Sequence, residues 1–390
     1  MKKVLVLGAG RGQVGLIKAA HNLGYKAIVA SIPGDYPGFS IADEVYDVDL
    51  RDAEAVAELA GRLKVDGVVA AGADLALPAL GAACEDNSLP GLSRAAARTS
   101  SDKSLMKAAF AENGVRTARH IVAYSEEDAV RATKDLNMPV IVKAIDLGGS
   151  RGINIVFRED EITDAFRNTM SVTHADHCVI EEYIDGYEVS ATAMVAGGET
   201  LFVLPMGDVR YGANDEIPVG HYVPLDVDPD ICEDIITQVR LAINAIGLDN
   251  CAVNADLMIL DRKAYVLELT GRLGANAIPE ITNEYYGLDI HELIVEAALG
   301  NADRIKQHDF SSHSDKVCYA QMLISEKGGT LLSTEIDDDA CDAWFFKKKG
   351  DRIDPFRSPH DCVGQVVVTG DTIEECRDHV QRILNKLQIA

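Results

Sequence analysis

Short apolar runs alternate with amphipathic segments over the first 95 residues. The runs VLVLGAG, KAIVAS and VDGVVAAG are continuous stretches of small and branched apolar residues. The segments VGLIKAAHNLG and AEAVAELAGRLK lie between them and carry apolar residues at helical spacing. Strands that are unbroken apolar runs, with helices between them, are typical of a parallel sheet covered on both faces. The pattern therefore predicts an α/β, doubly wound N-terminal domain over residues 1–95.

Beyond residue 95 the pattern changes to longer runs of β-branched residues joined by glycine turns, which is typical of antiparallel pairing. A helical stretch over 93–114 precedes extended residues 115–124 and a helix that begins at residue 125. Strands are expected within 138–157 and 178–206 and over 251–260, 263–270, 316–325 and 363–370. Further helices are expected over 231–247 and 374–387. We place a second domain at 96–305 and a small C-terminal α/β lobe at 306–390.

The charge balance narrows the choice of partners. The 390 residues include 37 Lys and Arg against 62 Asp and Glu, a formal net charge of −25 at pH 7. Duplex nucleic acid and anionic membranes need clustered positive charge, so neither is expected as a partner. No apolar run approaches the ~20 residues of a spanning helix, and the first run meets glycine too early for a secretory signal. The eight cysteines have neither CxxC pairing nor zinc-site spacing, which indicates reduced thiols and a cytoplasmic protein.

A glycine motif, GRGQVG, follows the first predicted strand. Gly10, Gly12 and Gly15 match the spacing of a dinucleotide-binding turn. That site also needs an acidic residue at the end of the second strand, and this strand ends in Ser31, while Asp35 lies in a Pro/Gly-rich loop. The sequence favours a tight strand-to-helix turn over a dinucleotide site.

A lysine followed by a glycine-rich loop gives a sharper signal. Lys143 lies on the predicted strand in PVIVKAIDLGGSRG, and the loop residues are Gly148, Gly149, Ser150, Arg151 and Gly152. Glycines let backbone N–H groups approach phosphate oxygens, and a lysine one strand-length away can reach the α/β-phosphates. Taken alone, a surface hairpin with an incidental lysine is an equally good interpretation.

Two further groups of charged residues interrupt apolar strands. Glu181, Glu182 and Glu188 lie in CVIEEYIDGYEVS, where a nucleotide base and ribose could satisfy them, although in isolation a solvated strand end is favoured. Asp256 and Glu268 lie on two strands joined by a short turn, where antiparallel pairing would make them neighbours. Two such carboxylates favour a hard cation such as Mg²⁺.

Arg272 follows Glu268 by four residues and could neutralise charge on a transferring phosphoryl group. A structural salt bridge between Glu268 and Arg272 is the alternative, but it does not explain Asp256.

The order of these elements resembles the ATP-grasp superfamily, and most closely its phosphoribosylglycinamide-synthetase-like and carbamoyl-phosphate-synthase-large-chain-like members. The stretches that carry the resemblance are GAGRGQVGLIKAA, PVIVKAIDLGGSRGI, PVGHYVPLDV and ELTGRLGAN, and it extends over almost the whole chain. It implies a Rossmann-like preATP-grasp domain, a two-lobed α+β ATP-grasp domain and a small C-terminal α/β lobe.

The resemblance also implies roles for individual residues in nucleotide binding. Lys103 would be the first nucleotide-binding lysine and Lys143 the second, with Gly148–Gly152 as the loop over the phosphates. Glu181 would receive the adenine amino group, Glu182 and Ile184 would offer backbone atoms, and Glu188 would hold the ribose.

At the metal and substrate end, the resemblance implies that Asp256 and Glu268 bind Mg²⁺, with Mn²⁺ as the alternative ion. Arg272 would stabilise the acyl phosphate and its transition state. Lys143, which would reach the α/β-phosphates, would also count as catalytic, and His221 would lie in the substrate pocket. Thr270 stands where many relatives carry Asn, which puts its role as a metal ligand in question.

The implied function is an ATP-dependent carboxylate–amine, or carboxylate–thiol, ligase that forms an acyl phosphate and releases ADP and phosphate. The partners would be small carboxylates and amines, selected by loops over 207–221 and 280–289, and relatives are often homodimers. A ligase joining phosphoribosylamine to glycine is the alternative within this chemistry, although Arg116, Arg119 and Arg210 form no obvious phosphoribose cluster in the sequence. An NAD(P)-dependent oxidoreductase using GRGQVG and a non-catalytic nucleotide sensor are alternatives of other classes.

Overall fold

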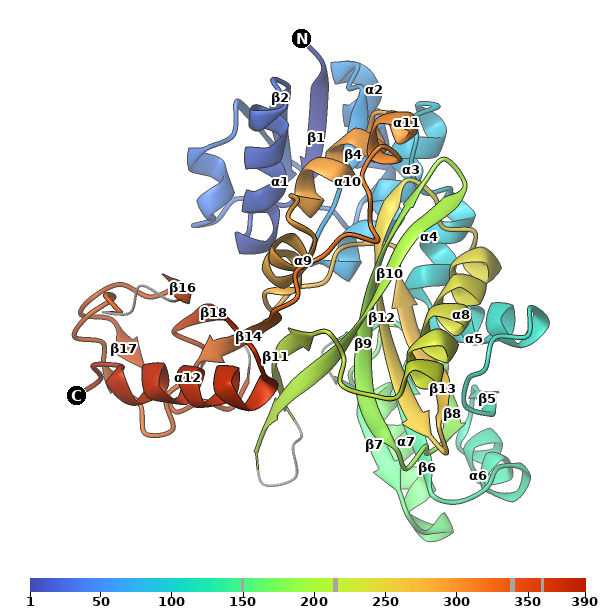
Figure 1. Cartoon of the computed structure of the whole chain (residues 1–390). Coiled ribbons are helices and arrows are strands. Elements are labelled where there is room, and N and C mark those ends of the chain that lie inside the picture. The colour runs from blue at the N-terminus through green and yellow to red at the C-terminus, as the bar shows by residue number, and fades with distance from the viewer. Residues whose placement is uncertain (149–150, 213–216, 337–340, 359–360) are drawn as a thin grey trace.

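The N-terminal domain is a four-stranded parallel sheet in the order β3-β2-β1-β4, covered by helices on both faces (Figure 1). The computed structural model describes residues 1–148, 151–212, 217–336, 341–358 and 361–390. The strands are β1 Lys3–Leu7, β2 Lys26–Ser31, β3 Glu44–Asp47 and β4 Gly67–Val69, and the helices are α1 Arg11–Asn22, α2 Ala53–Leu63 and α3 Leu77–Asp86. Short 3-10 turns occupy Pro37–Ser40 and Asp74–Ala76. The doubly wound prediction is confirmed, and β3 and α3 lie outside the elements that the sequence predicts.

Two helices replace the single helical stretch expected over 93–114. They are α4 Arg94–Ser101 and α5 Lys103–Glu112. Asp102 between them has extended backbone, and its carboxylate accepts hydrogen bonds from the backbone N–H groups of Ser104 and Leu105. This N-cap fixes the start of α5 at Lys103, because it satisfies donors that the first helical turn leaves unpaired.

A small lobe is built on an antiparallel sheet in the order β5-β8-β6-β7. Its elements are β5 His120–Ala123, α6 Glu126–Asp135, β6 Val140–Ala144, β7 Ile153–Val156, α7 Ile162–Met170 and β8 Cys178–Glu182, with a 3-10 turn at Glu159–Glu161. Helices α6 and α7 bury Ala129, Ile162 and Phe166 against one face of the sheet. The opposite face carries Lys143 and its cross-strand partner Ile153, so it is the face available to a ligand.

The centre of the molecule is an eight-stranded antiparallel sheet in the order β13-β12-β9-β10-β11-β14-β18-β16. Its strands are β9 Tyr187–Ala196, β10 Glu199–Tyr211, β11 Ile217–Val223, β12 Cys251–Leu260, β13 Lys263–Thr270, β14 Val317–Leu323, β16 Cys341–Phe345 and β18 Gly364–Gly370. Helix α8, Pro229–Ile246, covers one face through Ile235, Val239 and Ile243. The expectation of antiparallel strands beyond residue 95 is confirmed.

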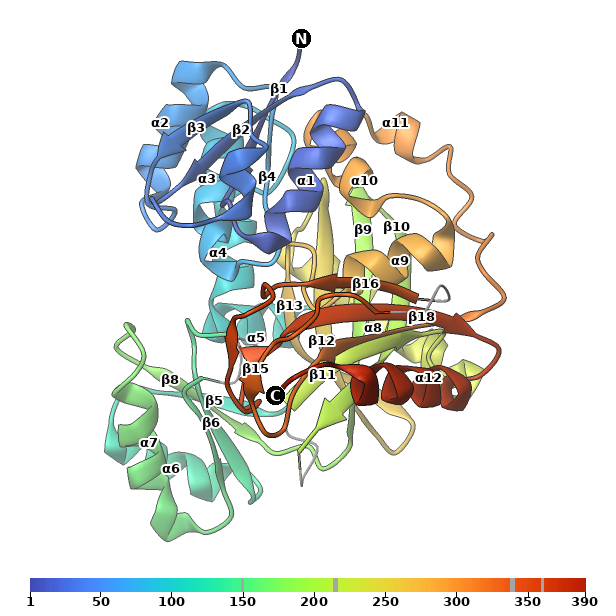
Figure 2. The same ribbon diagram turned by 90° about the vertical axis from the view of Figure 1, so that its left-hand side faces the viewer.

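The C-terminal segment adds three strands to this sheet and also forms a separate two-stranded sheet. Strand β14 pairs with β11, and β18 and β16 extend the same sheet to its edge. Helix α12, Ile373–Lys386, packs on β14 and β18, and β15 Gly329–Thr330 pairs with β17 Arg352–Ile353. Figure 2 shows this segment lying across the molecule between the N-terminal domain and the small lobe.

Three helices connect the central sheet to the N-terminal domain. They are α9 Ile278–Tyr286, α10 Ile290–Ala298 and α11 Ala302–Ile305, and α10 packs against both α1 and β4. The loop expected over 280–289 is therefore wrong for most of its length, because burial of Ile281 and Tyr285 holds α9 in place. Among the described residues, every helix is too short or too polar to span a bilayer.

Candidate active site

A pair of carboxylates lies on the face of the central sheet opposite α8. The register of β12 and β13 places Asp256 directly opposite Glu268, and Asn254 opposite Thr270. The prediction that these two carboxylates are cross-strand neighbours is therefore confirmed. Burial raises the pKa of Asp256 to about 8, and the charge of nearby Glu268 adds to the shift. Without a cation, this part of the sheet keeps Asp256 protonated near neutral pH.

The oxygen donors around this pair fit a hard divalent cation. The side-chain oxygens of Thr270 (Oγ1) and Asn254 (Oδ1) are buried without hydrogen-bond partners, next to the two carboxylates. In the described part of the chain, no group of three or more His, Cys, Asp or Glu side chains is arranged to hold a metal alone. Mg²⁺ bound to a nucleotide takes few protein ligands and completes its shell with phosphate oxygens and water, so this donor set suits it.

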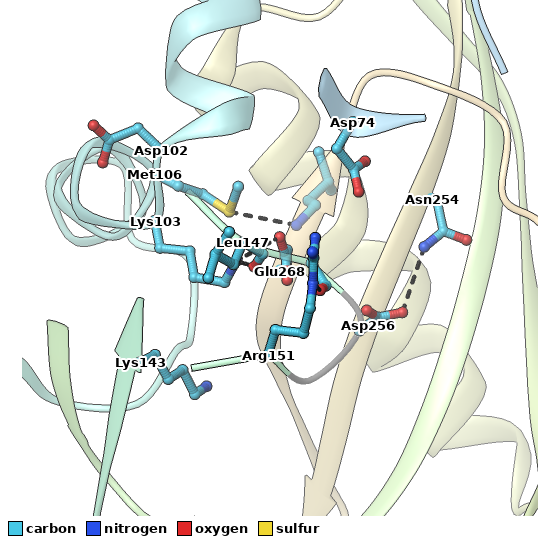
Figure 3. Close-up of polar contacts among 12 residues, drawn as sticks. Asp74, Asp102, Lys103, Met106, Lys143, Leu147, Arg151, Asn254, Asp256 and Glu268 are labelled. Carbon is cyan, nitrogen blue, oxygen red and sulfur yellow. Dashed lines mark hydrogen bonds and ion pairs between the residues drawn. The ribbon is translucent and has the colours of Figure 1, made fainter. Parts of the chain in front are cut away.

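Lys103 connects the carboxylate pair to the glycine-rich loop. Its ammonium lies 3.0 Å from Glu268 Oε1 and donates a 2.8 Å hydrogen bond to the carbonyl of Leu147, immediately before Gly148 (Figure 3). Arg151, at the far end of the loop, donates to the carbonyl of Gly148. Gly152 has a φ of +69°, which glycine adopts without strain. The predicted loop residues Gly149 and Ser150 lie outside the described residues.

Lys143 and Glu181 are joined in a buried cluster with a third residue, Lys107. Glu181 Oε2 lies 3.1 Å from the ammonium of each lysine, and Glu181 is 1% exposed. Burial would raise the pKa of Glu181, but the two lysines lower it to about 2. The other oxygen, Oε1, is buried without a partner, and such an acceptor is costly unless a donor fills it.

The residues predicted to bind the base and ribose, Glu182, Ile184 and Glu188, already have contacts within the protein. Glu182 accepts from the guanidinium of Arg119 and from the backbone N–H of Asn137 through the same side-chain oxygen, and its own N–H donates to Arg119 O. A hinge contact from Glu182 would therefore have to use its carbonyl oxygen. Ile184 is buried, and Glu188, near the start of β9, forms an ion pair with Arg210, near the end of β10.

Arg272 forms its ion pair with the N-terminal domain and not with Glu268. Its Nε donates a 2.7 Å hydrogen bond to Asp74 Oδ1, and Nη2 lies 2.6 Å from the same oxygen. The interpretation of Arg272 as a salt-bridge partner of Glu268 is thus wrong. A Cβ added at Gly148 would lie 3.1 Å from Asp74 Oδ2, so Arg272, Asp74 and the start of the glycine-rich loop meet at one place.

His221 belongs to a buried polar group on the same face of the sheet. Its Nδ1 lies 2.9 Å from Asp208 Oδ1, and Ser190 donates a hydrogen bond to that oxygen. Strand pairing places Ser190 opposite Asp256 and Asp208 opposite His221. The polar positions therefore run across five adjacent strands, from Glu268 to His221.

The GRGQVG turn is explained by packing. Gln13, buried inside the turn, donates through Nε2 to the carbonyl of Ala71, and its Oε1 is 3.0 Å from the position of a Cβ added at Gly8. A Cβ at Gly15 would lie 2.4 Å from His291 of α10. The glycines let α1 approach α10 and close the turn around Gln13, in agreement with the tight-turn prediction.

Four contributors were missed by the sequence pattern. Lys107 follows Lys103 by four residues, a helical spacing that places both on one side of α5, which was the available signal. Asp74 and Asp208 become visible only through their partners Arg272 and His221. Ile153, opposite Lys143, is 37% exposed on the ligand-side face of the small lobe.

Two protein-family models match this chain, and together they cover residues 101–390. The family model for the phosphoribosylglycinamide synthetase ATP-grasp (A) domain matches residues 101–337, and that for L-amino acid ligase C-terminal domain 2 matches residues 321–390. An alanine–anticapsin ligase of Bacillus subtilis is 27% identical over 292 residues, covering 66% of this chain. The match spans only 60% of that protein's length.

Solved structures match over the whole chain. The phosphoribosylglycinamide synthetase of Anaerococcus prevotii is 40% identical with a TM-score of 0.85, covering 100% of this chain and 99% of that one. The biotin carboxylase domain of the 2-oxoglutarate carboxylase of Hydrogenobacter thermophilus, solved with MgADP and bicarbonate, has a TM-score of 0.80. It is 20% identical and covers 100% of this chain and 90% of that chain, so it bears on the fold alone.

Proposed function

The chain belongs to the ATP-grasp family of carboxylate–amine ligases, and from that membership we propose that it uses ATP to join a small-molecule carboxylate to an amine. The observation that carries the proposal is the meeting of Lys103, Glu268 and the start of the glycine-rich loop, with Asp256 opposite Glu268. These residues come from four separate segments of the chain. Such a set of charges and backbone donors suits a nucleoside triphosphate bound with a divalent cation.

The nucleotide would lie between the small lobe and the central sheet. Ile153 and Ile155 are exposed on the ligand-side face of β7 and offer an apolar surface for the base. Glu181 Oε1, buried without a partner, would accept the exocyclic amino group, and Glu188 would take the ribose hydroxyls. Lys143 would turn toward the phosphates. Mg²⁺, or Mn²⁺ as the alternative, would be held by Asp256 and Glu268, with Thr270 as a weaker oxygen ligand, and would supply positive charge beside the phosphates.

The chemistry proceeds in two displacements. The substrate carboxylate attacks the γ-phosphorus, and the bond from that phosphorus to the oxygen bridging the β- and γ-phosphates breaks. ADP departs, and the carboxylate is now an acyl phosphate. The amine then attacks the acyl carbon, the C–O bond to phosphate breaks, and the nitrogen gives up its proton. Arg272 would neutralise the transferred phosphoryl group, with Asp74 holding its guanidinium. The chain's work is positioning and charge neutralisation, because phosphoryl transfer asks little covalent chemistry of side chains.

Analysis of the nucleotide products formed from ATP tests this proposal. The protein is incubated with ATP, Mg²⁺ and pools of amino acids and small carboxylates, and the nucleotides are separated. ADP and phosphate should appear only when a carboxylate is present, and the ligated product only when an amine is added. Lys143→Ala should abolish both, by a factor of ~10² or more. AMP and pyrophosphate would contradict the acyl-phosphate mechanism, and NADH binding with no ATP turnover would favour the oxidoreductase.

A phosphoribosylamine–glycine ligase is the second candidate, supported by the 40% identity to a phosphoribosylglycinamide synthetase over the whole chain. Against it, Arg116, Arg119 and Arg210 are engaged with Asp234, Glu182 and Glu188. The match of the C-terminal segment to an L-amino acid ligase domain favours an amino acid, rather than phosphoribosylamine, as the amine. Turnover with glycine and phosphoribosylamine, against turnover with pairs of amino acids, separates the two.

The remaining parts of the proposal concern setting and assembly. We expect a cytoplasmic protein that acts on small molecules and takes neither nucleic acid nor membranes as partners, in keeping with its net charge of −25. A homodimer, common among relatives, is the expected assembly.

A further inference from the structure

Two lysines share one buried carboxylate on the side of the site that faces the small lobe. Lys107 Nζ and Lys143 Nζ each lie 3.1 Å from Glu181 Oε2. The cluster joins three elements, because Lys107 lies on α5, Lys143 on β6 and Glu181 on β8. Counting charges gives two cations and one anion, so the cluster holds one positive charge more than its carboxylate neutralises.

The two lysines differ in how firmly they are held. Lys107 is fully buried and also donates a 2.6 Å hydrogen bond to Thr117 Oγ1, whose hydroxyl donates to the carbonyl of Val266. Lys143 is 8% exposed, and among the described residues its ion pair is with Glu181 alone. Lys107 is therefore tied to a second acceptor besides Glu181, whereas in the described part of the chain Lys143 is tied to Glu181 alone.

Burial gives this asymmetry an energetic consequence. A buried lysine is rare unless it is paired, and burial lowers the pKa of Lys107 to about 8 even with Glu181 beside it. A buried carboxylate that loses its last counter-ion is strongly destabilised, because no water replaces the lost interaction. If Lys143 were the sole counter-ion of Glu181, its departure toward a phosphate would carry that cost.

We propose that Lys107 is a positioning residue: it keeps Glu181 neutralised at all times, which releases Lys143 to bind the nucleotide phosphates. This inference rests on the proposed function, since it assumes that Lys143 binds a nucleotide. In this arrangement Glu181 also stays in place with Oε1 open to the base, because Lys107 anchors its other oxygen.

The alternative is that Lys107 has only a structural role, in packing and hydrogen bonding α5 against its neighbours. A purely structural role predicts that loss of Lys107 lowers stability without a specific effect on nucleotide affinity. It also predicts that neutralising Glu181 does nothing to repair the loss. The two roles therefore differ in a double-mutant cycle, which measures whether two residues act through one another.

The experiment measures the dissociation constant of MgATP for the full chain by calorimetry, below the unfolding temperature of each variant. Lys107→Met should weaken binding about tenfold or more, and Lys107→Arg, which keeps the charge, should recover most of it. In a Glu181→Gln background, which keeps the acceptor oxygen but not the charge, Lys107→Met should change the affinity less than about threefold. Lys3→Met, which removes a lysine bonded to Leu63 O in the N-terminal sheet, is the matched control and should leave the affinity unchanged.

The outcomes separate this inference from the function on which it rests. An equal loss of affinity from Lys107→Met with Glu181 or Gln at position 181 would overturn the inference, as would an unchanged affinity. A wild-type chain that fails to bind MgATP, or a Lys143→Ala variant that binds as well as wild type, would overturn the proposed function instead. If Lys107→Met does not fold, two comparisons still give the answer: Lys107→Met/Glu181→Gln with Glu181→Gln, and Lys107→Arg with wild type. The double variant removes both charges, Lys107→Arg keeps both, and in Glu181→Gln the ammonium of Lys107 keeps its hydrogen bond to Thr117.

Discussion

Asp256 shows how burial holds a carboxyl group in its neutral form when no cation is beside it. It lies beside Glu268 on the central sheet, and burial, reinforced by Glu268, raises its pKa to about 8. The unfolded chain loses this proton at an ordinary acidic pKa, so between pH 4 and 8 unfolding releases a proton. The contribution of Asp256 to stability is therefore lost as the pH rises through this range.

Asp256→Asn should consequently stabilise the protein in the presence of a chelator. We expect a gain of ~1 kcal/mol at pH 8, from removal of the like-charge contact and of the ionisable group, and a smaller gain at pH 5. The same variant should lose ligase activity and the stabilisation that Mg²⁺ with ATP gives to wild type. Denaturant unfolding at the two pH values measures the difference. A variant less stable than wild type at pH 8 would contradict the account of a repulsive pair.

Some residues of the site could be predicted from their neighbours in the sequence, and others depend on contacts between distant segments. Asp256 and Glu268 could be predicted as neighbours because a short turn between two strands leaves few registers. Lys107 could not be assigned, because a helical lysine is normally solvated, and its burial follows from Glu181, which is far away in sequence. Arg272 could be proposed as a site residue from the sequence, but its partner Asp74 comes from a different domain, and no pattern along the chain relates the two.

At the scale of elements, the start of α5 matters most to the site. Asp102 caps the helix, and the next residue, Lys103, joins Glu268 to the loop carbonyl of Leu147. The cap therefore sets the position of a site residue as well as the stability of a helix. Helix α4, which precedes it, is capped in the same way by Ser93 but supplies no side chain to the site.

This pair of caps gives a matched test. Asp102→Ala and Ser93→Ala should each cost ~1 kcal/mol of stability. Only Asp102→Ala should also weaken MgATP binding, because only α5 presents Lys103 to the phosphate loop. Unfolding free energies and MgATP dissociation constants of both variants check this expectation. A comparable loss of affinity in the two variants would mean that the effect comes from general destabilisation.

The elements themselves were predicted best where the pattern was long and regular. The strands Cys251–Leu260 and Lys263–Thr270 coincide with the predicted segments, because both are bounded by turn residues. The sequence predicts a loop where α9 lies, since Thr282, Asn283 and two tyrosines have weak helix propensity. Its stability comes instead from tertiary burial of Ile281 and Tyr285, which a local pattern does not report.

At the scale of the whole molecule, the site lies where separate parts of the chain meet. The N-terminal domain supplies Asp74, the small lobe supplies Lys143 and Glu181, and the central sheet supplies Asp256, Glu268 and His221. The boundary proposed near residue 95 lies beside the first residue of α4, and the segment 306–390, proposed as a separate lobe, shares its sheet with β11. Sequence could locate the change of pattern there but not the pairing of strands almost 100 residues apart.

The central claim is that the substrate carboxylate itself attacks ATP to form an acyl phosphate. It can be tested by labelling that carboxylate with ¹⁸O, once product analysis has identified the substrate, and by measuring the mass of the released phosphate. Attack on the γ-phosphorus followed by amine displacement leaves one carboxylate oxygen on phosphate, so the account predicts one ¹⁸O in each phosphate and none in the nucleotide. Label recovered in AMP, or phosphate free of label during turnover, would contradict it.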